Sequence, residues 1–529
     1  MSVTWDDTIS DGEEALHPWA NSIIAAIKRR GSKYVVTDDA YGDYQCDGTD
    51  DDVQIQAALD ALTGGRTNKE KVTLRGNFTV SSAIVIPSYT IVDFSEAIIN
   101  LADMANVNVF ESRDVTDIDV LVGVIEGNGA NQTTSVDKSG IFFGKTASNS
   151  ERINVIGGHI KNCIMCGVIF DYVKKGRILY PTTENNGESY TGASYPRGVY
   201  VDCGEEVTVF SPLSRNEGTG VKMANGNRYE LISPVVYGDS TKTTYDSILI
   251  QGVDRMQVSN PIIENAGQDG INLSYGAGSV ACTKIDILSP QVKSCRNGIN
   301  VMDSPVDITI KGGVLENNDR CGVRLAGATK SKIIGVTAKN NAQNVGGTSD
   351  DSGIRISDSS DNIIALCSSY DDQGVKTQLY GIREDGTSNL NIIKGNYCTG
   401  NSSGPYITVG ARNTYDGKVQ SPTPADLSGA AVTHYLLHAE EPLHLTRAIL
   451  LYTEASSADA GITVEIGKES DRNYYYTGTT EVNKAQWYTL SAPLLKNDVA
   501  YGDTVTFYSP GGKVGTGEIV CIISYAVGA

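Results

Sequence analysis

The sequence predicts an all-β protein whose main part is a right-handed parallel β-helix, a solenoid of stacked coils. A motif of Gly or Ser, a β-branched residue, any residue and an aliphatic residue returns every 22 to 31 residues between Gly140 and Gly381. A second short apolar run follows most copies, and Gly, Asn and Pro stand between the runs. Strands this short cannot each bury a core, whereas stacked repeats bury their aliphatic residues against one another. Leucine-rich repeats would need a Leu-x-x-Leu-x-Leu pattern, which the repeats lack.

Length and composition narrow the function classes. A single compact core stops growing near about 250–300 residues, and a solenoid avoids that limit for the 529 residues present. The net charge of −20 argues against a general nucleic-acid binder, but a local basic cleft would still accept an anionic sugar. No apolar stretch is long enough to predict a membrane span, and the first residues lack the pattern of a secretory signal.

The first two regions are an N-terminal segment, 1–33, and a cap with the first coils, 34–138. The segment has apolar residues at helical spacing, so a docking amphipathic helix and a poorly ordered tail both stay open. Further on, Thr49 or Asp50 can N-cap a helix that Gly64-Gly65 ends. We expect this helix, with Val53 and Ile55 on its apolar side, to cover the open first coil of the solenoid.

The run Asp47-Gly48-Thr49-Asp50-Asp51, followed by Ile55 to Leu59, resembles the N-terminal signature of the pectate-lyase superfamily. It is especially similar to the version in bacteriophage tailspikes and related β-helix polysaccharide depolymerases. With the repeats, the resemblance covers roughly residues 34–410. It implies a virion protein without a signal peptide, released by lysis, that forms a homotrimer and contacts other virion proteins through its N-terminus. The fold also hosts lyases, glycosidases, epimerases and non-catalytic virion parts, so the reaction stays open.

The regular coils are expected at 139–410, followed by a turn-rich linker at 411–430. Beyond the linker, longer alternating strands at 431–529 predict a β-sandwich or jelly roll. In tailspikes, which this order of domains resembles, such a C-terminal domain often joins three chains or binds a receptor.

The variable residue of the motif should point outward, because side chains alternate along a strand. Stacked coils then place successive variable residues about 4.8 Å apart in one column. The column reads Tyr200, Lys222, Leu249, Asn272, Asn300, Arg324, Arg355 and Arg383. Two interpretations stay open: a groove whose arginines bind an anionic, carboxylate-bearing polysaccharide, and a solvated face whose arginines pair with nearby carboxylates. The candidate substrate-binding residues are Tyr200, Asn272, Asn300, Arg324, Arg355 and Arg383.

Acidic residues directly after the column strands are the candidate catalytic groups: Asp303, Asp358, Glu384 and Asp385. Two carboxylates on either side of a glycosidic bond can hydrolyse it, and coils one or two steps apart can supply both. Glu264 and Glu316 recur at one repeat position and are interpreted as turn residues. No cofactor is indicated, and no His/Asp metal cluster is evident; a Ca²⁺ site made of Asp side chains stays open, without a location.

Three functions follow. The first is a tailspike-like depolymerase that cleaves a cell-surface polysaccharide by hydrolysis or β-elimination. The second is a non-catalytic receptor-binding or structural virion spike on the same fold. The third is a uronate lyase or C5-epimerase, which requires the arginine column to be the active site. The first is preferred, and the sugar, the bond and the host are left open.

Overall fold

The computed structural model describes residues 31–407 apart from 40, 134, 136, 137, 189, 191–195, 239–244 and 345–350, and beyond 407 it describes only the course of the strands. Residues 1–30 of the N-terminal segment, for which a helix and a tail stay open, and most of the predicted linker lie outside the described residues. The chain divides into two compact units, Met1–Arg320 and Cys321–Ala529, which are taken in turn.

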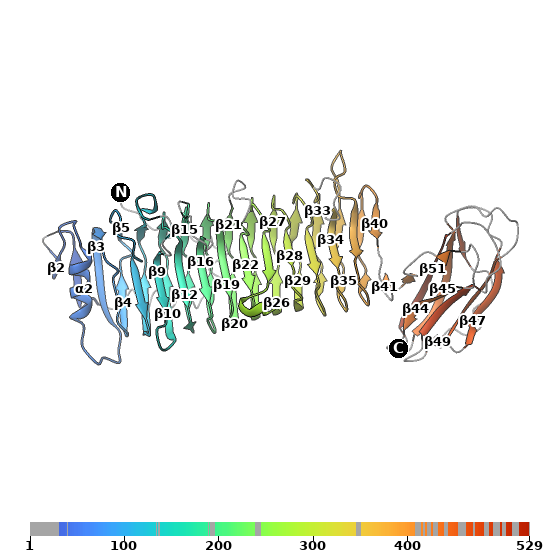
Figure 1. Cartoon of the computed structure of the whole chain (residues 1–529), viewed down its shortest axis with the longest axis horizontal. Coiled ribbons are helices and arrows are strands. Elements are labelled where there is room, and N and C mark those ends of the chain that lie inside the picture. The colour runs from blue at the N-terminus through green and yellow to red at the C-terminus, as the bar shows by residue number, and fades with distance from the viewer. Residues whose placement is uncertain are drawn as a thin grey trace. The chain divides into compact units, whose positions relative to one another are not determined.

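The first unit is a parallel β-solenoid with three strands in most coils, one more than the repeats predicted (Figure 1). The first sheet contains β1 (Tyr34–Thr37), β3 (Glu70–Val80), β4 (Thr90–Asp93), β7 (Thr116–Leu121), β10 (Ser150–Ile156), β14 (Arg177–Leu179), β17 (Thr208–Phe210), β20 (Asn227–Ile232), β23 (Asp254–Ser259), β26 (Thr283–Leu288) and β29 (Val306–Lys311). The second contains β5 (Ala97–Leu101), β8 (Val124–Glu126), β11 (His159–Lys161), β15 (Thr182–Glu184), β18 (Leu213–Arg215), β21 (Val235–Tyr237), β24 (Ile262–Glu264), β27 (Gln291–Lys293) and β30 (Val314–Glu316). Two short strands, β2 (Tyr44–Gln45) and β13 (Val173–Lys174), and two 3₁₀ turns, Gly129–Asn131 and Ala277–Ser279, lie beside these coils.

The third sheet, called the column sheet below, carries the glycine motif. Its strands are β6 (Phe110–Arg113), β9 (Ser139–Gly144), β12 (Cys166–Asp171), β16 (Arg197–Asp202), β19 (Thr219–Ala224), β22 (Ile248–Gln251), β25 (Ile271–Ser274) and β28 (Ile299–Val301). They pair in parallel and in chain order. Glu264 and Glu316, interpreted as turn residues, instead end β24 and β30, because the second sheet supplies the strand that the repeats had not revealed.

The core is a stack of aliphatic side chains. The β-branched residue of the motif lies directly opposite its counterpart in the next coil, and each copy is fully buried: Ile141, Val168, Val199, Val221, Ile248, Ile271 and Ile299. Each methyl-rich side chain therefore contacts the coil above and the coil below, so burial is shared between repeats.

Asparagine holds the turns between the second sheet and the column sheet. Asn162, Asn216, Asn265 and Asn317 have φ angles of 53°, 52°, 59° and 54°, the left-handed conformation that asparagine tolerates better than most residues. Asn186, which is fully buried, accepts a hydrogen bond from the Cys163 amide at 2.9 Å and donates one to the Ile160 carbonyl at 3.1 Å. Asparagine thus satisfies backbone groups where a coil turns inward.

Helix α2 (Asp52–Asp60) contacts β1, β2 and β3 near the start of the chain (Figure 1). Its N-cap is Asp51, one or two residues later than predicted, and the Asp51 carboxylate accepts hydrogen bonds from the Gly48 and Thr79 amides instead of capping the helix. Ile55 is buried as predicted, whereas Val53 is 61% exposed and does not belong to the buried side. That the helix closes the first coil stays a prediction.

The second unit begins with parallel strands of its own. The strands that carry its copies of the glycine motif, or follow them, are β31 (Val323–Ala326), β34 (Ser352–Ser357), β37 (Tyr380–Asp385) and β40 (Gly404–Ile407). The other strands of these coils are β32 (Lys332–Ile334), β33 (Thr337–Lys339), β35 (Ile363–Ala365), β36 (Ser368–Tyr370), β38 (Ile392–Lys394), β39 (Tyr397–Thr399) and β41 (Thr414–Tyr415).

Beyond residue 415 the strands pair antiparallel. They are β42 (Lys418–Gln420), β43 (Ala425–Asp426), β44 (Val432–His438), β45 (Leu443–Tyr452), β46 (Ile462–Lys468), β47 (Asp471–Thr480), β48 (Gln486–Thr489), β49 (Asp498–Val499), β50 (Thr504–Ser509) and β51 (Glu518–Val527). Strands β44, β50, β46 and β47 form one sheet, and β45 and β51 pair in another. The packing of these sheets into a sandwich stays a prediction. Within the described residues, no helix is long and apolar enough to cross a bilayer.

Candidate functional site

In the first unit the variable residues of the motif do lie in one column. Tyr200, Lys222, Leu249, Asn272 and Asn300 stand opposite one another on successive strands from β16 to β28. The expectation that they all face solvent is wrong, because Lys222, Leu249 and Asn272 are each 9% exposed and Asn300 is 2% exposed. The polar and charged side chains in this column therefore either bind other groups of the protein or line a site that is shielded from solvent.

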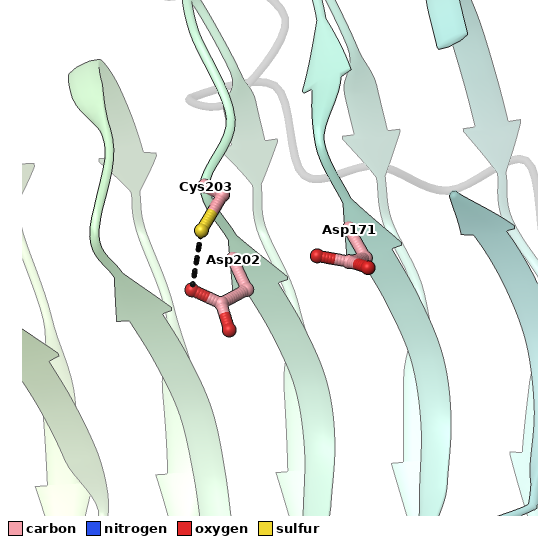
Figure 2. Close-up of side chains that lie close together, drawn as sticks. All are labelled: Asp171, Asp202 and Cys203. Atoms are coloured by element: carbon pink, nitrogen blue, oxygen red, sulfur yellow. Dashed lines mark hydrogen bonds between the residues drawn. The ribbon is translucent and has the colours of Figure 1, made fainter. Parts of the chain in front are cut away.

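Two aspartates lie side by side at the ends of β12 and β16 (Figure 2). Asp171 stands opposite Asp202 in the register, both are half-buried, and Cys203 directly follows Asp202. One carboxylate oxygen of each aspartate and the Cys203 sulfur all lie within 4.8 Å of one another. Both aspartates are one strand position past the aliphatic residue of the motif, so each coil presents its carboxylate on the Tyr200 side of the sheet.

The two carboxyl groups of this pair have different surroundings. Burial, followed by the negative charge of Asp202, raises the pKa of Asp171 above its usual range. Asp202 instead accepts hydrogen bonds from the Tyr200 hydroxyl at 2.5 Å, the Asn225 side-chain amide at 2.9 Å and the Cys203 thiol at 3.5 Å. Asp171 is thus suited to hold a proton, and Asp202 is suited to act as the carboxylate.

The same group lacks the ligands of a cation site. Ca²⁺ requires six to eight oxygen ligands, whereas this group offers two carboxylates and a sulfur. Burial raises the pKa of the Cys203 thiol, which donates to Asp202 and is therefore protonated. The donor set fits neither Ca²⁺ nor a thiolate-bound metal, and paired carboxyl groups are the better description.

Two cations lie beside the Tyr200 ring. The Arg197 guanidinium carbon is 4.2 Å from the ring centroid, and the Lys222 ammonium is 5.2 Å from it. Burial and the neighbouring Arg197 lower the pKa of Lys222 to about 8. Burial, followed by the charge and hydrogen bond of Asp202, raises the pKa of Tyr200 well above its usual range, so the phenol stays protonated.

Further along the column, the predicted residues Asn272 and Asn300 serve two buried carboxylates. The Asn272 amide donates to Asp246 at 2.8 Å, and the Asn300 amide donates to Asp269 at 2.7 Å. Arg296 also binds Asp269, with its Nη2 at 2.9 Å. Burial and the charge of Asp269 raise the pKa of Asp246 to about 6. Because Asp269 is fully buried and Asp246 is 8% exposed, this cluster belongs to the interior and is not exposed to a substrate.

In the second unit the three arginines lie on neighbouring strands, as the repeat spacing predicts. Arg324 stands opposite Arg355, and Arg355 stands opposite Arg383. Arg355 and Arg383 both donate to Asp385, through Nε atoms at 3.1 and 3.2 Å, and Arg383 also binds the buried Asp351 at 3.1 Å. These contacts match the interpretation of a salt-bridged face, with Asp385 as the shared partner.

The other predicted catalytic acids are held in separate places. Glu384 occupies the inward position opposite Ile356 and is fully buried. Asp358 and Asp303 have φ angles of 50° and 69°, and they accept hydrogen bonds from the backbone amides of Thr387 and Tyr275, respectively. The Thr387 amide lowers the pKa of Asp358. Within each unit the structure brings no two of these three acids together.

The residues of the carboxylate pair were not among those predicted from the sequence. Tyr200 was predicted, and Lys222 was placed in the column without a role. Asp171 and Asp202 could have been found, because Gly167 to Asp171 and Gly198 to Asp202 repeat the same pattern with Asp after the last apolar residue. Arg197 precedes the motif glycine and has no counterpart in the neighbouring copies, so the repeat pattern carries no signal for it.

Comparison with known proteins supports the fold. A family profile described as "Right handed beta helix region" matches residues 246–418. No curated protein matches the chain. Among solved structures, the A-module of the mannuronan C-5 epimerase AlgE4 from Azotobacter vinelandii is 14% identical, with a TM-score of 0.50, over 72% of this chain and 100% of that one.

Two other solved structures have lower scores. The tailspike protein of E. coli bacteriophage HK620, in complex with a pentasaccharide, is 12% identical, with a TM-score of 0.48, over 95% of this chain and 94% of that one. The endo-xylogalacturonan hydrolase from Aspergillus tubingensis is 10% identical, with a TM-score of 0.40, over 67% of this chain and 95% of that one. The profile match and the similarity to the AlgE4 module thus show that the chain is a right-handed β-helix protein, and at 14% identity the similarity concerns the fold alone.

Proposed function

We propose that this chain is a carbohydrate-active enzyme that binds a polysaccharide across the column sheet and hydrolyses it at Asp171 and Asp202. One observation carries the proposal: two half-buried carboxyl groups face each other on neighbouring strands, and one of them has a raised pKa. Pairs of acids whose surroundings separate their proton affinities are typical of glycosidases.

The spacing of the pair favours double displacement. Retaining glycosidases place their carboxyl groups about 5–5.5 Å apart, whereas inverting ones leave about 6.5–9.5 Å for a water molecule. One carboxylate oxygen of Asp171 and one of Asp202 lie within 4.8 Å of each other, which is nearer the separation of retaining enzymes than that of inverting ones. Asp171 would protonate the glycosidic oxygen as the bond to the anomeric carbon breaks, and Asp202 would attack that carbon to form a glycosyl ester. Water, deprotonated by Asp171, would then cleave the ester and restore both groups.

The lyase and epimerase hypothesis receives less support. It requires the arginine column to be the active site, but the guanidinium groups of Arg355 and Arg383 contact Asp385 and Asp351, and a guanidinium stays protonated. The Tyr200 phenol also holds its proton. Hydrolysis by the aspartate pair needs neither group as a base.

The tailspike-like assembly is a second part of the proposal, and it rests on the resemblance of the Asp47 to Asp51 signature. We expect a homotrimer that is a virion component, joined through its C-terminal strands, with the N-terminal segment contacting other virion proteins. Light scattering on the full chain should give three times the 56.4 kDa chain mass, and a monomer would contradict this part alone.

Cleavage is tested with a panel of capsular, O-antigen and uronate-containing polysaccharides, followed by release of reducing ends. Asp171→Asn and Asp202→Asn should each lower the rate at least about 100-fold, because each loses a proton-transfer or nucleophilic group. Asp286→Asn, an exposed residue of β26, is the matched control and should keep the wild-type rate. Wild-type rates in both site variants would refute the assignment, and no cleavage of any polymer would favour the non-catalytic spike.

A further inference from the structure

The cations beside Tyr200 differ from the other basic residues that the column contains. Arg197 is 5% exposed and Lys222 is 9% exposed, so each side chain is at least nine-tenths buried. Among the described residues, no carboxylate lies within ion-pair distance of either cation. The Nε atom of Arg197 is also buried without a hydrogen-bond partner. In the second unit, by contrast, Arg355 and Arg383 contact carboxylates directly.

Two buried positive charges this close to one ring are costly without an anion. Burying an ammonium or guanidinium removes its hydration, and a second cation nearby adds repulsion. Cation–π attraction to the Tyr200 ring offsets only part of the lost hydration and the repulsion. Asp202 attracts Lys222 from a distance, but its carboxylate is occupied by Tyr200 and Asn225. An external anion would compensate the charges of the ammonium and the guanidinium together.

The surroundings select the chemistry of that anion. Asp171 and Asp202 lie on the same face, so a singly charged group is repelled less than a doubly charged phosphate. An arginine fork beside a lysine matches the two oxygens of a carboxylate. The Tyr200 ring, an amphipathic group of the kind that packs on sugars, is half-buried at the same place.

We propose that Arg197 and Lys222 bind the carboxylate of an acidic sugar, which packs on Tyr200 next to the Asp171–Asp202 pair. This inference rests on the proposed function, and it assigns the substrate class: a polysaccharide that contains a uronic or similar carboxylate-bearing sugar. The hydroxyl of Tyr200 contacts Asp202, so the acidic sugar lies beside the bond to be cleaved. The two cations fix its position and take no part in proton transfer.

Saturation-transfer NMR on the full chain tests the site with D-galacturonate and D-glucuronate as probes and with galactose and glucose as neutral partners. The uronates should bind and the neutral hexoses should not. Lys222→Met and Arg197→Met should each weaken uronate binding at least tenfold. Lys332→Met, which removes an exposed charge on β32 in the second unit, should leave binding unchanged. Tighter binding of galactose 6-sulfate than of galacturonate would overturn the carboxylate assignment.

A second measurement on the wild-type chain avoids any dependence on the folding of the variants. A water-soluble amine reagent should modify Lys222 more slowly when galacturonate is present, as read by peptide mass spectrometry. Lys332 should react at the same rate with and without it. Equal modification of Lys222 in both conditions would refute the inference even if cleavage depends on Asp171 and Asp202. Protection of Lys222 in a chain that cleaves no polymer would refute the proposed hydrolysis and leave the acidic-sugar site standing.

Discussion

Replacing Lys222 by methionine removes a buried charge while keeping an unbranched side chain that is only one atom shorter. Burial and Arg197 lower the pKa of Lys222 from 10.5 to about 8. A folded-state pKa below the unfolded value means that the fold binds this proton more weakly than the unfolded chain does. Wild-type stability should therefore rise as pH increases from about 8 to about 10.5. The difference between the two pKa values corresponds to about 3 kcal/mol. This is the upper limit of the stability that the fold loses at pH 7 by burying the charged Lys222 side chain.

The assay compares the free energy of unfolding of the wild type and Lys222→Met in guanidinium chloride, followed by circular dichroism between pH 7 and pH 10. The variant should be more stable at pH 7 by up to about 3 kcal/mol, and the gap should close as pH rises because the wild-type ammonium loses its proton. Lys332→Met is the control and should follow the wild type at every pH. A gap that stays constant with pH would refute the reasoning, since it would mean that Lys222 titrates like an exposed lysine.

Three further predictions concern other charged groups. Cleavage should fall on the alkaline side as Asp171 loses the proton that it donates, and a rate unaffected by pH there would exclude it as the acid. The pKa of Asp246 is about 6 in the folded chain and about 4 in the unfolded chain, so its contribution to the free energy of unfolding is complete below pH 4. That contribution is lost as pH rises from about 4 through about 6, by at most about 3 kcal/mol. Asp246→Asn should flatten this part of the plot of the free energy of unfolding against pH, and an unchanged slope would contradict the prediction. Arg383→Ala should lower the free energy of unfolding by about 2 kcal/mol, because the buried Asp351 loses its partner. The cleavage rate should not change. A loss of cleavage in a variant that stays folded would instead support the arginine groove.

The solenoid could be predicted because its physical cause is periodic. Each copy of the glycine motif repeats an inward β-branched residue, so the spacing alone places Arg324, Arg355 and Arg383 on neighbouring strands. The third strand of each coil was missed because runs such as Ile262–Glu264 are only three residues long. A period of two cannot be recognised in so few positions.

The candidate site was only partly predictable. Side chains alternate along the strand from Gly381 to Glu384, and this alternation already assigns Glu384 to the inward position. The structure agrees with that assignment and not with the catalytic role proposed for Glu384. Asp171 and Asp202 carry the pattern of strand-end carboxylates, but so do many solvated aspartates. What distinguishes them is their mutual distance and burial, which depend on the register of β12 with β16. The side chains around Tyr200 converge from two strands, and a single sequence does not show which of them approach its ring.

The most direct test of hydrolysis at the aspartate pair is an NMR spectrum of the first product released from a cleaved polysaccharide. The account predicts a saturated sugar at the new non-reducing end and an anomeric centre that keeps the configuration of the original bond. An unsaturated uronate at that end would show elimination, and an inverted anomeric centre would show direct attack by water. Either result would contradict the roles assigned to Asp171 and Asp202.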